Sequence, residues 1–142
     1  MTKKLLLNIP IDANHMKEAM EFVHKYANSM NIPVELFTKF DLVLEELFVN
    51  VNNYAYPDGN GDIELSCSFK HTKENGKKIF CLYLRDWGIY FNPLNNKTPD
   101  IDKSIQDRQI GGLGIFLITE MTDNCFYTRE NGINEFKACF FV

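Results

Sequence analysis

Two strand–turn–strand patterns constrain the fold of this chain more than any other feature. In each of them, two runs of alternating apolar and polar residues flank a polar turn that contains the pair Asn-Gly, which favours an antiparallel hairpin. The first hairpin is predicted at residues 62–70 and 77–86, and the second at residues 124–130 and 134–142. Hairpin strands pair antiparallel, so these patterns argue against the parallel sheet of a Rossmann fold.

Helices are predicted on both sides of the first hairpin. Residues 12–30 form one helix, with Asp12 as a suitable N-cap, and residues 33–55 form the next, because their apolar side chains recur at helical spacing. A short strand at residues 4–9 and a third helix at residues 113–122 complete the pattern. We therefore expect an α+β fold, a two-layer α/β sandwich in which helices cover one face of a mixed, mainly antiparallel sheet.

The composition suits one compact domain. The chain has 142 residues, of which 45% are hydrophobic and 24% charged, so we expect a single domain over residues 1–142. The formal net charge is −4 and the basic residues are scattered, which argues against direct binding of nucleic acid. The N-terminal apolar run is broken by Asn8 and Pro10 and is too short for a signal sequence or a membrane span. We expect a cytoplasmic protein with no membrane association.

The four cysteines are spaced too widely for a CxxC metal site and lie within predicted strands. We expect all of them to be reduced and to serve as small apolar side chains of the core. They are Cys67, Cys81, Cys125 and Cys139.

Three short segments, far apart in the sequence, carry the candidate chemistry. On the second helix, Glu46 and Asn50 are four residues apart and share one face, and Asn53 continues that stripe. The second segment, Asp86-Trp-Gly88, follows a predicted strand, and the third, Gly111-Gly112-Leu113-Gly114, precedes the third helix. Taken singly, the three are typical of a solvated helix face, a turn aspartate and a flexible hinge. Their order, spacing and structural settings together favour one nucleotide site.

In this combination the segments resemble the Bergerat ATP-binding fold, the superfamily of gyrase, the mismatch-repair ATPases and the histidine kinases. They are most similar to the anti-sigma-factor serine/threonine protein kinases, because Phe91 and Pro93 follow the aspartate and residues 111–118 read Gly-Gly-Leu-Gly-Ile-Phe-Leu-Ile. The resemblance extends from about Asp12 to the C-terminus.

The resemblance implies a role for each motif residue. Asn50 would give its side-chain oxygen to Mg²⁺, and Glu46 would be the catalytic general base for the attacking hydroxyl. Asp86 would accept a hydrogen bond from the adenine amino group, and Gly88 would let the backbone pass close to the base. The other cofactor-binding residues that it implies are Asn53, Phe91, Gly111, Gly112, Leu113 and Gly114.

The loop before the third helix matches the ATP lid of that family at residues 94–110. Arg108 matches a lid arginine that would act in catalysis by steadying charge on the γ-phosphate, although an isolated loop arginine would simply be solvated. The glycines at 111–114 and the helix N-terminus would bind phosphates. Two positions depart from the family pattern: Lys137 aligns with a threonine near the adenine, and Tyr54 aligns with a histidine.

We therefore expect an ATP- and Mg²⁺-dependent serine/threonine protein kinase. The resemblance implies that it phosphorylates an anti-sigma-factor antagonist protein, that a sigma factor is a second partner, and that the chain forms a homodimer. Two other functions stay open: a nucleotide-dependent binding module that phosphorylates nothing, and a histidine-kinase catalytic domain. Glu46 argues against the first, and the lack of a separate helical segment with a phosphoacceptor histidine argues against the second.

Overall fold

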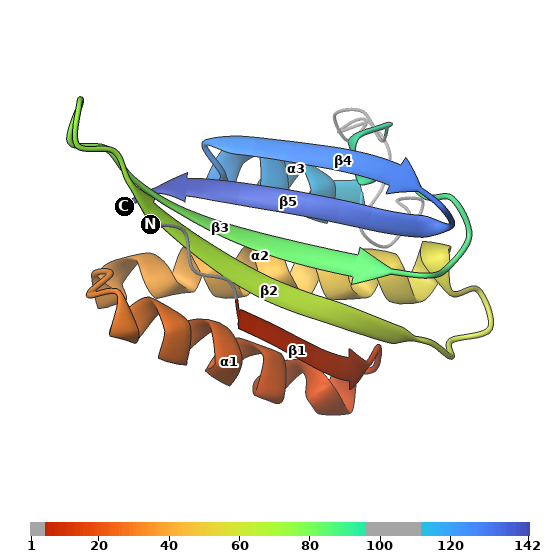
Figure 1. Cartoon of the computed structure of the whole chain (residues 1–142). Coiled ribbons are helices and arrows are strands. Elements are labelled where there is room, and N and C mark those ends of the chain that lie inside the picture. The colour runs from red at the N-terminus through yellow and green to blue at the C-terminus, as the bar shows by residue number, and fades with distance from the viewer. Residues whose placement is uncertain (1–4, 96–111) are drawn as a thin grey trace.

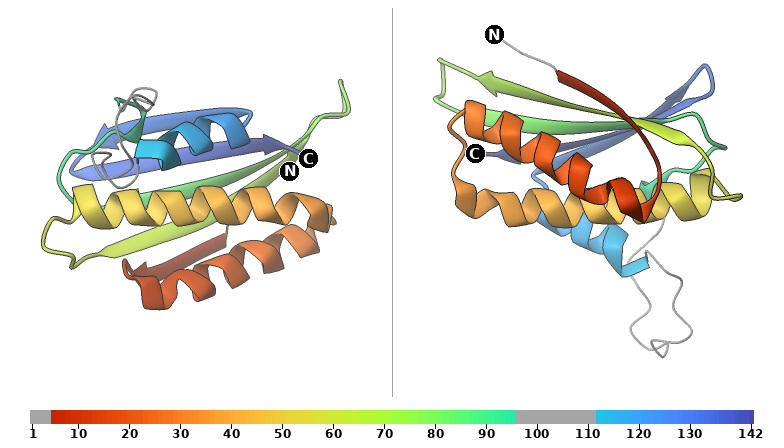
Figure 2. Two further views of the ribbon diagram at one scale, coloured as in Figure 1. Left: turned by 180° about the vertical axis from the view of Figure 1, so that it is seen from behind. Right: turned by 90° about the horizontal axis from the view of Figure 1, so that it is seen from below.

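In the residues that the structure describes, five antiparallel strands form one sheet and three α-helices lie on one of its faces (Figures 1 and 2). The structure is a computed structural model that describes residues 5–95 and 112–142. The strands are β1 (Leu5–Pro10), β2 (Asp62–His71), β3 (Lys78–Asp86), β4 (Asn124–Glu130) and β5 (Ile133–Phe141). Their order across the sheet is β1-β2-β3-β5-β4.

The helices are α1 (Met16–Ser29), α2 (Phe37–Asn50) and α3 (Gly112–Met121). This confirms the predicted two-layer α+β architecture, and each of the four strand pairings is antiparallel. Both predicted hairpins are present as β2–β3 and β4–β5. Most of the predicted lid, residues 96–110, lies outside the described residues.

Local hydrogen bonds define the start of α1 and the end of α2. Asp12 caps a 3₁₀ turn (Ala13–His15) that leads into α1, because its carboxylate accepts a hydrogen bond from His15 N at 3.2 Å. At its C-terminal end α2 continues as a π-helix (Val51–Ala55), in which Tyr56 N donates to Val51 O at 3.1 Å. The predicted helix thus reaches Ala55, with its last turn wider than an α-helical turn.

The core lies between the helices and the sheet. Phe40 of α2 is fully buried, with its ring centroid 4.6 Å from that of Phe80 on β3 and 4.8 Å from that of Phe140 on β5. Such tilted and edge-on aromatic pairs add to the free energy gained from burying the rings. The apolar stripe predicted on α2 is therefore the face that packs on the two central strands.

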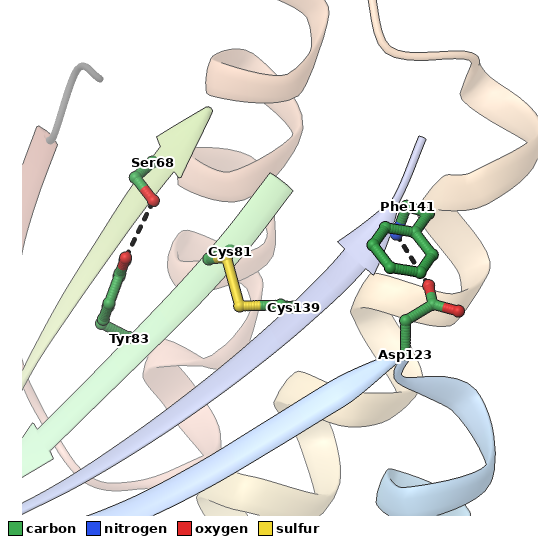
Figure 3. The surroundings of a disulfide bond; sticks show 6 residues. All are labelled: Ser68, Cys81, Tyr83, Asp123, Cys139 and Phe141. Atoms are coloured by element: carbon green, nitrogen blue, oxygen red, sulfur yellow. Dashed lines mark hydrogen bonds between the residues drawn. A yellow bond between two sulfur atoms is a disulfide. The ribbon is translucent and has the colours of Figure 1, made fainter. Parts of the chain in front are cut away.

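The prediction that all four cysteines are reduced is wrong for one pair. Cys81 of β3 and Cys139 of β5 form a disulfide (Figure 3). Cys67 and Cys125 are free thiols. Cys81 and Cys139 are 58 residues apart in the sequence but directly opposite each other in the β3–β5 register, with Cα atoms 4.2 Å apart. Sequence spacing gives no sign of this proximity, because it arises only when the two hairpins pair.

In residues 5–95 and 112–142, none of the helices combines the length and the apolar character that crossing a bilayer would require.

The disulfide should stabilise the fold and change the thiol count. Reduction, or replacement of Cys81 with serine, should lower the free energy of unfolding by about 2–4 kcal/mol, because the unfolded chain gains conformational freedom.

Burial raises the pKa of the Cys67 thiol, so this thiol should react with a thiol reagent only after unfolding. Titration of the non-reduced, denatured protein should count two thiols; a count of four would contradict the disulfide. Cys125→Ser is the matched control without a bond to lose.

Candidate functional site

Glu46 lies on the last turns of α2, one turn before Asn50. Its side chain is half-buried, and burial raises the pKa of its carboxyl, with a smaller contribution from the neighbouring charge of Glu45. A carboxylate with a raised pKa is a stronger base once it is ionised, which suits a general base near neutral pH. Glu45 itself is exposed and lines a different groove, between α2 and the start of α1. The prediction that Glu45 points elsewhere is confirmed.

Asn50 has a buried oxygen whose hydrogen bonding is incomplete. Its side chain is fully buried, and Nδ2 donates to the Glu46 carbonyl oxygen at 2.7 Å. Its Oδ1 accepts no hydrogen bond from any part of the chain that the structure describes. Leaving such an oxygen without a partner costs about 1–3 kcal/mol. An amide oxygen is also a suitable ligand for Mg²⁺, so this atom meets the chemical requirement of the predicted metal site.

Asp86 ends β3 as a buried carboxylate, 3% exposed. The two hydrogen bonds that it accepts from described residues both end on Oδ1, from Gly88 N at 2.9 Å and from Asn134 Nδ2 at 2.8 Å. Burial raises the pKa of the Asp86 carboxyl, and these hydrogen bonds and the charge of Arg129 partly offset that rise. A buried carboxylate with one oxygen held by internal donors is suited to accept a ligand N–H with the other oxygen.

Gly88 joins the first and second motifs. A Cβ atom at this position would overlap the backbone oxygen of Ala55, at the end of the π-helix. That same oxygen accepts a hydrogen bond from Ile89 N at 2.9 Å. The missing side chain therefore lets the loop after β3 lie directly against the end of α2, which places Asp86 and Asn50 on neighbouring elements.

Phe91 and Tyr54 form an aromatic stack between the same two elements. Their ring centroids are 4.7 Å apart, and both side chains are half-buried. Tyr54, which the resemblance aligns with a histidine, thus packs against the loop after β3. Phe91, Asp86 and their neighbours enclose a cavity of about 10 Å³. That volume is enough for about one water molecule and far smaller than an adenine ring.

Asn134 is a site residue that the sequence analysis missed. It lies directly opposite Asp86 in the β3–β5 register and is 3% exposed. Lys137 is not near Asp86, so its alignment with the family threonine is corrected: it pairs with Tyr83, and its Nζ lies 5.4 Å from the Tyr83 ring centroid and 5.6 Å from that of Phe126. In the sequence, Asn134 is marked only by its position near the start of the last strand. That position points to Asp86 only once the register of β3 and β5 is known.

Of the remaining predicted site residues, some lie in the described part of the chain and others lie outside it. Gly112, Leu113 and Gly114 form the start of α3, which packs beside α2 and so lies near the other two motifs (Figure 2). Asn53 is exposed within the π-helix. Arg108 and Gly111 lie outside the described residues.

The sequence matches the family described as histidine kinase-like ATPase domain over residues 9–140, which is nearly the whole chain. The chain belongs to this family, and the predicted Bergerat-type ATPase fold is thereby confirmed. Membership implies ATP binding. No curated protein matches the chain significantly.

Two solved structures share the fold. One is a chain of the SiaB-SiaC complex from Pseudomonas aeruginosa, with a TM-score of 0.50 and 14% identity over 97% of this chain and 89% of the other. The other contains the RsbU and RsbW domains of Rv1364c from Mycobacterium tuberculosis, with a TM-score of 0.54 and 9% identity over 97% of this chain. This chain spans only 32% of that second structure.

Replacing Gly88 should disturb the contact between the two motifs. Gly88→Ala should unfold at a clearly lower temperature than the wild-type protein, because the added methyl group meets backbone atoms of Ala55 that cannot rotate away. Gly132→Asn is the control: Gly132 has open space around it and a φ of 78°, which asparagine tolerates. Equal melting temperatures for Gly88→Ala and the wild type would show that the contact with Ala55 is not close.

Proposed function

We propose that the chain is an ATP- and Mg²⁺-dependent serine/threonine protein kinase of the anti-sigma-factor type. The observation that carries the proposal is the buried Oδ1 of Asn50, which accepts no hydrogen bond from the described residues and lies one helical turn from a half-buried Glu46. A metal ligand and a general base on one helix face are the two groups that phosphoryl transfer to a hydroxyl requires from this helix.

The proposed adenine site is centred on Asp86. Its Oδ2 would accept the adenine amino group, which guanine lacks at that position, and the backbone at Gly88 would lie against the base. Because the cavity between Asp86 and Phe91 has only about 10 Å³, the base would enter by displacing Phe91 from its stack on Tyr54. Phe91 would then contribute to binding as an aromatic wall of the opened site.

The proposed phosphate and metal site lies at the C-terminal end of α2. Asn50 would hold Mg²⁺, which supplies charge neutralisation on the phosphates. The backbone of Gly111, Gly112, Leu113 and Gly114 would donate to phosphate oxygens at the start of α3, with Asn53 nearby on the π-helix and Arg108 acting on the γ-phosphate. The segment 94–110 is proposed as the lid over this site.

The proposed substrate is a hydroxyl of a small antagonist protein, and Glu46 would take its proton as the γ-phosphoryl group is transferred. A sigma factor is proposed as the second partner and a homodimer as the working unit, in the cytoplasm. The shared fold with a chain that contains RsbU and RsbW domains, and with a chain from a SiaB-SiaC protein complex, supports this choice over a histidine-kinase domain.

Loss of Asp86 should weaken ATP binding selectively. Asp86→Ala should lower the affinity for ATP by about 1–3 kcal/mol, because the amino group of the base then lacks an acceptor, and it should change GTP binding far less. Trp87, the single tryptophan of the sequence, adjoins Asp86 and is 48% exposed, so its fluorescence offers a direct titration signal. Equal ATP affinity of the two proteins would contradict the assignment.

Replacing Glu46 should separate binding from chemistry. Glu46→Gln should keep ATP affinity but slow phosphoryl transfer by about 10²–10⁴-fold.

Because the pKa of Glu46 is raised, wild-type activity should fall as the pH drops through a value above the ordinary pKa of glutamate, where the base becomes protonated. Glu45→Gln should leave the rate at pH 8 unchanged and move this acid limb to lower pH, since the Glu45 charge raises the pKa of Glu46. Wild-type rates in Glu46→Gln would place the base elsewhere.

Asn50 should matter only when magnesium is present. Asn50→Ala should remove most of the affinity that Mg²⁺ adds to ATP binding, while binding measured in a chelator should change little. Asn52→Ala serves as the control, because Asn52 is on the same turn but lines the groove beside α1. Calorimetric titrations with and without Mg²⁺ measure both effects; the same Mg²⁺ gain in Asn50→Ala would rule out this ligand.

A further inference from the structure

A buried amide, that of Asn134, connects the proposed adenine acceptor to three other groups of the site. Its side chain lies between the ends of β3 and β4, with Asp86 on one side in the strand register and Arg129 on the other. Its side chain is 3% exposed.

The amide makes four hydrogen bonds. Nδ2 donates to Asp86 Oδ1 at 2.8 Å and to the Ile89 carbonyl oxygen at 2.8 Å. Oδ1 accepts from Arg129 Nη1 at 2.9 Å and from the Tyr127 hydroxyl at 2.5 Å. An asparagine side chain has two N–H donors and an oxygen with two lone pairs, so its hydrogen-bonding capacity is fully used.

The chemistry of the four partners permits only one orientation of this amide. A carboxylate and a carbonyl oxygen can only accept, and a guanidinium can only donate. Turning the amide over would set its oxygen against the oxygens of Asp86 and Ile89, and its NH₂ group against Arg129. Asn134 is therefore held with its NH₂ group toward Asp86, and Arg129 fixes the loop as well by donating to the Gly88 carbonyl oxygen at 3.1 Å.

This arrangement determines which oxygen of Asp86 is offered to a ligand. Oδ1 accepts hydrogen bonds from Asn134 Nδ2 and from the backbone N–H of Gly88. Two donors on one oxygen fix the plane of the carboxylate and leave Oδ2 as the acceptor for a further N–H. The Arg129 cation lies behind the amide and favours the ionised carboxylate.

We propose that Asn134 is a positioning residue for adenine recognition, which sets the Asp86 carboxylate for the amino group of the base and acts only through Asp86. The proposal rests on the proposed function of Asp86 and adds that base selectivity depends on a residue that does not contact the nucleotide.

The test compares ATP with purine riboside triphosphate, which lacks the 6-amino group. Asn134→Thr should weaken ATP binding about 10- to 100-fold, the worth of a hydrogen bond to a charged group, and should change binding of the analogue less than about twofold. In an Asp86→Ala background, Asn134→Thr should have no further effect on ATP. Lys137→Thr, on the same strand but on the outer face of the sheet, should bind both nucleotides as the wild type does.

Two results would overturn the inference. Equal losses for ATP and the analogue would indicate a general effect on the fold, and a full loss in the Asp86→Ala background would indicate direct contact with the nucleotide. If Asn134→Thr does not fold, Tyr127→Phe removes one hydrogen bond on the far side of the amide and should give a smaller loss with the same selectivity. Wild-type protein that binds no ATP would refute the proposed function; wild-type protein that binds ATP, with an unaffected Asn134→Thr, would refute this inference alone.

Discussion

The pairing of β3 with β5 is the interaction on which the rest of the structure depends. It joins the two hairpins into one sheet, and it sets Cys81 opposite Cys139 near one end of the pair and Asp86 opposite Asn134 at the other end. A slip of one residue would turn every side chain of one strand to the other face of the sheet. The covalent bond across this pair therefore protects the register that brings the buried carboxylate and the buried amide together.

A second contact, between the loop after β3 and the end of α2, assembles the proposed ATP site, and the polar groups buried at that site cost stability. Burial raises the pKa of both Asp86 and Glu46, so the folded protein holds these protons more tightly than the unfolded chain does. The two carboxyls contribute favourably to stability at a pH below their pKa in the unfolded chain. This contribution is lost as the pH rises through their pKa in the folded protein. The Oδ1 of Asn50, which accepts no hydrogen bond from the part of the chain that the structure describes, is a third buried polar group that costs stability.

Local sequence signals predicted the helices, strands and turns. The features that they did not predict depend on contacts between segments that are distant in sequence. The Asn131-Gly132 turn is confirmed with φ angles of 53° and 78°, and the helical stripe of α2 packs on the sheet as expected. The motif residues Glu46 and Asp86 could be proposed from the sequence because their types and settings are local. The disulfide and the contact between Asn134 and Asp86 could not be predicted in this way, since both follow from the register of strands that are distant in sequence. The π-helical end of α2 likewise contacts a segment that is distant in sequence, the loop after β3.

A crystal structure with Mg²⁺ and a non-hydrolysable ATP analogue would test the central claim most directly. The account predicts Asn50 Oδ1 at about 2.0–2.1 Å from the metal. It also predicts the adenine amino group within hydrogen-bonding distance of Asp86 Oδ2, with Asp86 Oδ1 still held by Asn134. A nucleotide bound elsewhere, or bound here with Asn50 turned away from the metal, would contradict it.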